Sequence, residues 1–292
     1  DDELERANIE IETAAPGPFQ IRLEFMSDIT PRFQSAFQSA ANRWGTVIRN
    51  DLPNRTFNLI ELPSVCGFGN EARTVTVDDV LIAVEVREID GEAGVLGQAG
   101  PCILRATDRS PLVGFMEFDS ADLSALDRLG RMEEVILHEM GHVLGIGTLW
   151  QDFLENPSFP NQAGADTRFV GPRASAAYQT LGGSLDSVPV ENNGVSGSAD
   201  GHWRESTFRN ELMSPRLSLN DVTLPLSSVT IASLSDLGFY EVDSTASDPF
   251  ELASPLALSQ EPDPDDRLEH GLILPEFVMT PEGVVQPSRN EP

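Results

Sequence analysis

Apolar positions near the start of the chain follow two different periods. Between residues 19 and 25, apolar and polar residues alternate, which is the pattern of a half-buried strand. After Pro31, apolar residues recur every three or four positions, and Thr30 is of a type that caps helices. The pattern therefore predicts a strand followed by an amphipathic helix whose buried face is made of Phe33, Phe37, Ala41, Trp44 and Ile48.

Strand formers then dominate residues 58–62, 75–89 and 113–118, and Asp78-Asp79 interrupts the second of these segments. Residues 132–144 carry a regular helical pattern, and Gly145 follows where a helix would end, because glycine adopts the left-handed conformation without steric cost. The first half thus combines strands with two long helices, which is an α+β arrangement.

The second half of the chain is less regular. Between residues 147 and 201, Pro, Gly, Asn and Ser dominate, and a loop of this length in a compact domain is usually functional or disordered. Ser227 can cap a short helix that ends at Gly238. We therefore divide the chain into a lead-in (1–18), an N-terminal subdomain (19–145), a C-terminal subdomain (146–245) and an acidic, Pro-containing tail (246–292).

The charge of the chain restricts its partners. The net charge is −28, and all 19 basic residues are Arg. An acidic surface of this size repels phosphate backbones, which argues against nucleic acid as a partner. No apolar stretch approaches the length of a membrane span, and a chain that begins at Asp1 without Met fits a processed, secreted product.

Two cysteines, Cys66 and Cys102, enclose a segment rich in strand formers. A disulfide between them would contribute about 3–4 kcal/mol in the chain-entropy model, and an extracellular setting would permit it. Two buried, reduced thiols are the alternative. We favour the disulfide.

The motif His138-Glu139-Met140-Gly141-His142 lies within the second predicted helix. Two His four residues apart share one helix face and can bind one metal ion, with the intervening carboxylate beside the bound water. A pair of surface His that binds nothing is the alternative, but the intervening Glu and the terminating Gly145 favour a zinc hydrolase.

A catalytic zinc usually takes three protein ligands and one water, so the motif lacks one ligand. Two His remain, His202 and His270. The carboxylates of Asp152, Glu155 and Glu211 are competing candidates.

The sequence resembles the leishmanolysin branch of the metzincin zinc endopeptidases, in the form of its bacterial-type homologues. Ordinary metzincins place a third His three residues after the Gly, where this chain has Thr148. Leishmanolysin-like proteins place it far downstream, shortly before the methionine of a Met-turn, and His202 and Met213 match that layout. The likeness covers roughly residues 19–245 and is strongest around residues 138–150 and 202–215.

The resemblance implies a metzincin-like fold, with a mixed twisted sheet and two long helices before a largely irregular subdomain that holds the Met-turn and a short helix. It implies His138, His142 and His202 as ligands of one catalytic Zn²⁺, and Met213 beneath the metal. Asp152 also resembles the aspartate of the aspzincin pattern, but stands one residue late, which turns a helical side chain by about 100°.

The expected reaction is hydrolysis of peptide bonds in protein substrates, with Glu139 as general base. The strand at residues 113–118 is the expected edge for pairing with an extended substrate. The alternative is a non-catalytic, zinc-stabilised binding or adhesion module, although such a module has no need of Glu139.

A calcium site is a further expectation for the second half of the chain. The loop offers oxygen ligands of the kind that Ca²⁺ takes, although their spacing matches no calcium motif. These ligands would come from Asp186, Glu191, Asn192, Asn193 and Asp200.

Overall fold

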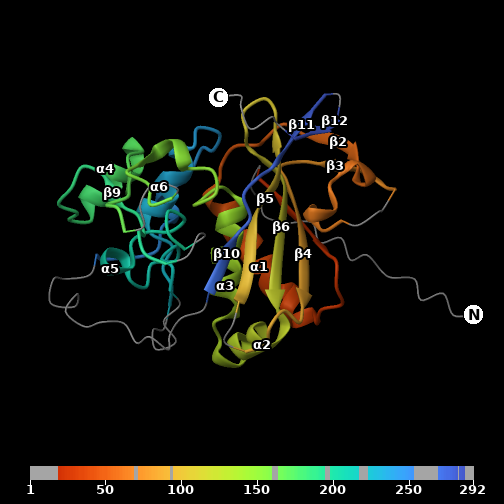
Figure 1. The fold of residues 1–292 in the computed structure, drawn as a ribbon, viewed down its shortest axis with the longest axis horizontal. Helices are drawn as coiled ribbons and strands as arrows, with labels where there is room; N and C mark the ends of the chain where they lie inside the picture. Colours follow the sequence, from red (N-terminus) through yellow and green to blue (C-terminus); the bar gives the residue numbers. More distant parts are fainter. Residues whose placement is uncertain are drawn as a thin grey trace, which may run out of the picture.

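A computed structural model describes residues 19–68, 72–92, 95–159, 164–194, 198–216, 223–252, 269–281 and 283–286. The predicted lead-in at residues 1–18 lies outside the described residues, as do residues 253–268, 282 and 287–292 of the predicted acidic tail. Two lobes are visible in Figure 1, one built on a sheet and one built from short helices and loops.

The larger lobe is built on a seven-stranded mixed sheet in the order β1-β4-β6-β5-β11-β12, with β10 also paired to β5. Neighbouring strands are parallel, except that β5 is antiparallel to β6 and β12 is antiparallel to β11. The strands are β1 (Ile21–Phe25), β4 (Val80–Arg87), β5 (Val95–Arg105), β6 (Pro111–Asp119), β10 (Glu269–Leu272), β11 (Phe277–Thr280) and β12 (Gly283–Val285).

Both faces of this sheet are covered, so its central strands read as continuous apolar runs. All nine residues of β6 are buried. In β4, Ile82 and Val84 face the main core, whereas Leu81 and Ala83 face a smaller core on the opposite side. The smaller core lies under a hairpin of β2 (Arg55–Asn58) and β3 (Thr74–Val77).

Helices α1 (Pro31–Val47), α2 (Ser120–Leu129) and α3 (Met132–Val143) contribute to the main core. The Thr30 side chain accepts a hydrogen bond from the Phe33 amide and caps α1. The Trp44 indole of α1 donates to the Leu137 carbonyl of α3 over 3.0 Å. This bond fixes α3, the helix of the His-Glu-x-x-His motif, against α1.

The described residues of the smaller lobe include α4 (Pro172–Thr180), α5 (Glu205–Phe208) and α6 (Ser228–Asp236). They also include a small sheet of β7 (Leu154–Glu155), β8 (Arg168–Phe169) and β9 (Val188–Pro189). The Asp236 carboxylate at the end of α6 accepts hydrogen bonds from the Arg173 and Ala174 amides at the start of α4. Packed aromatic rings of Trp150, Phe169, Trp203 and Phe208 form its interior.

Several sequence predictions are confirmed. The fold is α+β, and the strand and helix predicted within residues 19–48 are present. The strand segment at residues 75–89 breaks at Asp78-Asp79. The Ser227 side chain caps α6 by accepting a hydrogen bond from the Thr230 amide. The disulfide between Cys66 and Cys102 is also present, with 5.6 Å between the two Cα atoms. No helix in the described ranges is both long and apolar enough to cross a bilayer.

Other predictions are wrong. A strand was expected at residues 58–62, but strand β2 ends at Asn58. The Asn58 side chain accepts a hydrogen bond from the Ile60 amide, and a 3₁₀ turn follows. Helix α4 lies inside the segment that was expected to be irregular. The expected tail contributes β10, β11 and β12 to the sheet, because its short apolar runs pair with β5 despite the acidic surroundings.

The prediction that residues 113–118 form a free sheet edge is also wrong. Strand β6 lies between β4 and β5 and pairs with both. Its continuous apolar character, which made it easy to recognise, is a property of interior strands rather than of edges. The antiparallel strand β5, which the apolar pattern did not reveal, lies next to it.

Asp119, at the end of β6, joins three segments. One carboxylate oxygen accepts from the amides of Ile89, Asp90 and Gly91, and the other accepts from Ala121 and caps α2. Desolvation alone would raise the pKa of Asp119, but these backbone donors lower it to about 2. The ionised form is therefore the one that stabilises the fold.

We predict that Asp119→Asn lowers the free energy of unfolding by about 1–2 kcal/mol at pH 7, because a cap and several charge-assisted hydrogen bonds weaken. The depressed pKa makes this stabilisation complete above about pH 4 and diminishing as the pH falls towards 2. Urea unfolding between pH 7 and pH 3 measures it. Asp127→Asn, at a half-buried position of α2 where the carboxylate pairs with Arg32 and accepts no backbone amide of the described residues, serves as the control, and an equal loss in both variants would contradict the prediction.

Candidate metal centre

Helix α3 brings His138 and His142 to one face, one helical turn apart. Their Nε2 atoms lie 3.0 Å from each other. Glu139 lies between them in the sequence and is fully buried, as is His142. Gly145 follows the helix with a φ of +114°, so the expected helix end is confirmed.

The third imidazole comes from His202, in the smaller lobe. Its Nε2 lies 3.1 Å from that of His142 and 3.2 Å from that of His138. The His202 backbone carbonyl accepts from the Glu191 amide, and the next residue, Trp203, donates to the Met213 carbonyl. The structure thus brings together the three His that the sequence selected, from positions separated by 60 residues.

Each ring contacts a backbone carbonyl through its other nitrogen. The Nδ1 atoms of His138, His142 and His202 lie 2.6, 2.8 and 3.0 Å from the carbonyl oxygens of Leu212, Ile146 and Ser198. A carbonyl can only accept, so each Nδ1 carries the proton and each Nε2 presents a lone pair. All three lone pairs therefore point towards one another.

Three acceptor nitrogens at such short distances repel one another unless a cation lies between them. Neutral imidazoles whose Nδ1–H groups are bonded to carbonyls are typical zinc ligands. In a tetrahedral zinc site with bonds of about 2.0–2.1 Å, ligand nitrogens are roughly 3.3 Å apart. The observed separations of 3.0–3.2 Å are close to this value, so the donor set fits a divalent metal.

Met213 packs directly against Gly141 of α3, in the turn whose Leu212 carbonyl contacts His138. A Cβ atom on Gly141 would lie only 3.0 Å from the Met213 sulfur and 3.2 Å from the Trp44 ring. A side chain at position 141 would therefore require Met213 or Trp44 to shift by a few tenths of an ångström. The glycine of the motif thus allows close packing of α3, and its backbone conformation does not require glycine.

Glu211 is the anchor of that turn, a role that the sequence did not reveal. Its buried carboxylate accepts from the Met213 amide over 2.6 Å and from the amide and hydroxyl of Ser227. The Thr230 hydroxyl also donates to it, and the same hydroxyl accepts from the Trp203 indole. Burial raises the pKa of Glu211 above its ordinary value, even though these hydrogen bonds lower it.

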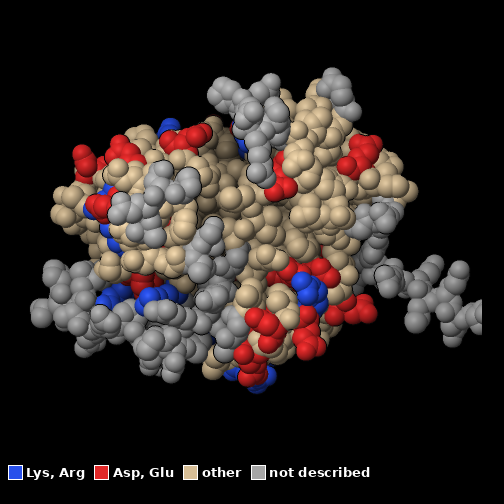
Figure 2. Space-filling view, in the orientation of Figure 1, with Lys and Arg blue, Asp and Glu red and all other residues tan. Residues whose placement is uncertain are grey.

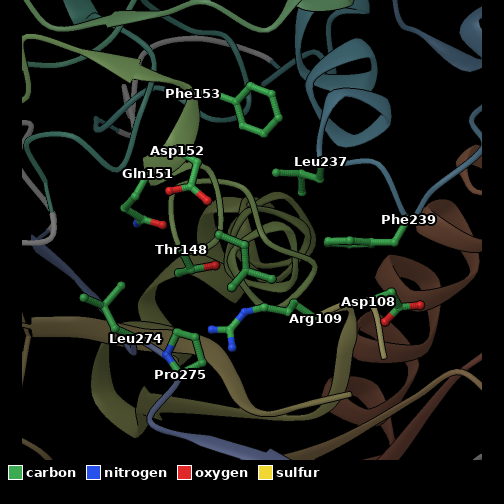
Figure 3. Close-up of a pocket in the computed structure, with 11 residues that line it drawn as sticks. Asp108, Arg109, Thr148, Gln151, Asp152, Phe153, Leu237, Phe239, Leu274 and Pro275 are labelled. Atoms are coloured by element: carbon green, nitrogen blue, oxygen red, sulfur yellow. The ribbon is translucent and has the colours of Figure 1, made fainter. Parts of the chain in front are cut away.

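The competing carboxylate ligands lie elsewhere. Glu211 faces Ser227 and Thr230, Glu155 is exposed in β7, and Asp152 lines a cavity of about 480 Å³ beyond the end of α3 (Figure 3). Within the described ranges, the His138, His142 and His202 group includes none of them. Thr148, at the position of the third His in ordinary metzincins, donates its hydroxyl proton to the His142 carbonyl.

Among the described residues, Asp186, Glu191 and Asp200 belong to no cluster of His, Cys, Asp and Glu side chains that could hold a metal ion, so calcium is not supported. The Asp200 carboxylate accepts from the amides of Ser158 and Phe159, and Glu191 accepts from those of Asn192 and Asn193. These oxygens fasten loops to one another. Sequence composition alone cannot distinguish that use from metal binding.

A mixed sheet that supports a His-Glu-x-x-His helix, with a third His from a second lobe, defines a metallopeptidase type of scaffold. Comparison with known families is consistent with this class: the leishmanolysin family matches residues 64–256. The chain belongs to the leishmanolysin family, whose characterised members are zinc metalloendopeptidases.

Individual relatives share the central part of the chain. Leishmanolysin of Leishmania major is 32% identical over 165 residues, covering 54% of this chain and 26% of that protein. The ciliated left-right organizer metallopeptidase of Xenopus laevis is 27% identical over 201 residues, covering 60% of this chain and 28% of that protein. The matches thus span only about a quarter of the length of these relatives.

We predict that Glu211→Gln destabilises the protein by about 1–3 kcal/mol, because the amide turns one buried acceptor into a donor that faces other donors. Zinc affinity should fall as well, since Leu212 and Met213 both belong to the turn that Glu211 holds. Urea unfolding and competition with a zinc chelator measure the two effects. Glu241→Gln, at an exposed position, is the control, and equal results for both variants would reject the role of Glu211.

Proposed function

We propose that this chain is a zinc-dependent endopeptidase that hydrolyses peptide bonds in protein substrates. The supporting observation is the set of three imidazoles whose Nε2 lone pairs converge while each Nδ1 is held by a carbonyl. Membership of the leishmanolysin family supports zinc as the metal and peptides as the substrate class.

In this proposal His138, His142 and His202 bind the metal, and three neutral ligands leave its positive charge uncompensated. Bound zinc supplies Lewis acidity, which polarises the scissile carbonyl and lowers the pKa of a water ligand towards about 7. A fourth protein ligand would close the site, and within the described residues the cluster consists of three His. An open position suits catalysis better than a purely structural role.

Glu139 is the proposed general base. It follows His138 directly on α3 and is buried beside the ring cluster. Its carboxylate accepts a proton from the attacking water and returns that proton to the leaving amine. Because the group is shielded from solvent, its interaction with a developing ammonium is stronger than it would be in water.

The central experiment compares Glu139→Gln with Glu133→Gln. Glu133 lies on the same helix but is exposed in its first turn, so the substitution is chemically matched. We expect Glu139→Gln to retain one zinc per chain and to lose about 10²- to 10⁴-fold in kcat, since the general base is removed. Casein digestion, with metal analysis of the same samples, measures both properties.

Glu133→Gln should retain both zinc and activity, and phenanthroline should abolish digestion by the wild-type protein. Normal turnover in Glu139→Gln would reject its role as the base. A zinc-loaded wild-type protein that cleaves no protein or peptide would favour the non-catalytic binding module.

A second prediction concerns the third ligand. His202→Ala should weaken zinc binding by more than about 100-fold, because even the partners of ligands contribute 10- to 100-fold. Asp152→Ala should leave zinc binding unchanged, because Asp152 lines the cavity beyond α3. Zinc affinity by chelator competition distinguishes the two variants, and the reverse ranking would overturn the assignment.

We also infer an extracellular location. The Cys66–Cys102 disulfide is typical of oxidising compartments. Acidic side chains are spread over both lobes on the face drawn in Figure 2, consistent with a net charge of −28 and a highly soluble surface.

A further inference from the structure

The outer edge of β5 is covered by the chain's own C-terminal segment. Strand β10 pairs with β5 in parallel, with His270, Gly271 and Leu272 opposite Gly97, Gln98 and Ala99. Strand β11 pairs further along, with Phe277 opposite Ile103. Figure 1 shows β10 running beside β5, on the side of the sheet that faces the smaller lobe.

This edge passes the metal centre at its middle. Gly114 of β6 pairs with Pro101 of β5, and a Cβ atom on Gly114 would lie 2.3 Å from Val143, the residue that follows His142. The Gly100-Pro101 part of β5 is therefore level with the His142 end of α3. At this point a Cβ atom on Gly100 would lie 1.9 Å from the Ile273 carbonyl oxygen, so the C-terminal backbone lies directly against β5.

The same segment forms a wall of two cavities. Leu272 and Leu274 line a cavity of about 250 Å³ together with Gly147 and Gly201, which lie beyond His142 and just before His202. Leu274 also lines the cavity of about 480 Å³ drawn in Figure 3, beside Thr148 and Arg109. The segment thus borders both chain segments that lead to the metal ligands.

The segment is held unevenly. Strand β11 is anchored by the buried side chains of Val278 and Met279 and by its hairpin with β12. Strand β10 has four residues and a register irregularity at its start, and it has no hairpin partner among the described residues. Between them, the Ile273 amide donates to the Ala99 carbonyl over 2.9 Å, while the Leu274 side chain is 55% exposed.

An extended peptide binds most readily to a sheet by adding a strand at an edge, where main-chain groups give affinity and side-chain pockets give specificity. Strand β6 cannot serve, since both its neighbours are in place. The outer side of β5 is level with the His142 end of α3, and removal of β10 would expose it while β11 remains.

We propose that residues 269–275, here termed the strap, occupy the peptide-docking edge of β5 and must leave it before an extended substrate can reach His138, His142 and His202. The inference rests on the proposed function for its substrate, a polypeptide in extended conformation. The strap is an intramolecular competitor: it lowers apparent substrate affinity in proportion to the fraction of molecules in which it is bound.

Ile273→Pro tests the strap in the full-length protein. Proline removes the amide that donates to Ala99 and is compatible with an extended preceding residue. Ile273→Val is the matched control, because it keeps the amide and trims a single methylene group. Unchanged zinc content and circular dichroism show that each variant is folded.

We expect Ile273→Pro to lower KM for a long peptide substrate by roughly five- to tenfold with kcat unchanged. This is the shift expected when the loss of one backbone hydrogen bond moves the equilibrium from the bound strap towards the released strap. Amide hydrogen exchange at residues 95–100 should accelerate in this variant and remain slow in Ile273→Val. A synthetic peptide of residues 269–276, added to Ile273→Pro, should raise KM again as a competitive inhibitor.

A binding assay separates failure of the strap from failure of the proposed function. Fluorescence anisotropy measures how tightly a labelled peptide binds to Glu139→Gln and to Glu139→Gln/Ile273→Pro, both loaded with zinc. This measurement does not depend on turnover. Tighter binding by the double variant supports the strap, even if the wild-type protein never hydrolyses a peptide. Faster amide hydrogen exchange at residues 95–100 without tighter peptide binding overturns the proposed role of the strap. The same conclusion follows if Ile273→Pro changes neither this exchange nor KM.

Discussion

The hydrogen bonds between three imidazoles and three backbone carbonyls are the interaction on which the rest of the structure depends. The acceptors belong to Leu212, Ile146 and Ser198, which lie in three separate segments. Each bond selects the same tautomer and turns a lone pair to a common point. The two lobes therefore have to be correctly placed before a metal can bind, and metal binding in turn stabilises their arrangement.

The smaller lobe is organised around that requirement with little regular secondary structure. The Glu211 carboxylate accepts hydrogen bonds from the Met213 turn and from the start of α6. It is also linked to the Trp203 indole through the Thr230 hydroxyl. Removing such a carboxylate from water is costly, and several donors offset the cost. Polar contacts of this kind supplement an apolar interior that is continuous with the main core of the sheet lobe.

Sequence patterns predicted what local chemistry determines. The cap at Thr30, the break at Asp78-Asp79 and the helix end at Gly145 are decided within a few residues, and all three are present. Strand β5 was missed because Gly97, Gly100 and Pro101 hide its apolar pattern, and the pairing of β10 with it is a long-range contact. The convergence of His202 with the motif was expected only from family resemblance, since spacing alone left Asp152, Glu155 and Glu211 as alternatives.

The disulfide between Cys66 and Cys102 has a mechanical consequence for the sheet. It ties β5 covalently to the 3₁₀ turn at Ser64–Cys66, on the side of the smaller core. With β6 on one flank and this cross-link on one face, β5 does not rely on its outer neighbour to stay in register. In the proposed strap exchange, a strand fastened in this way keeps its register while β10 gives way to a peptide.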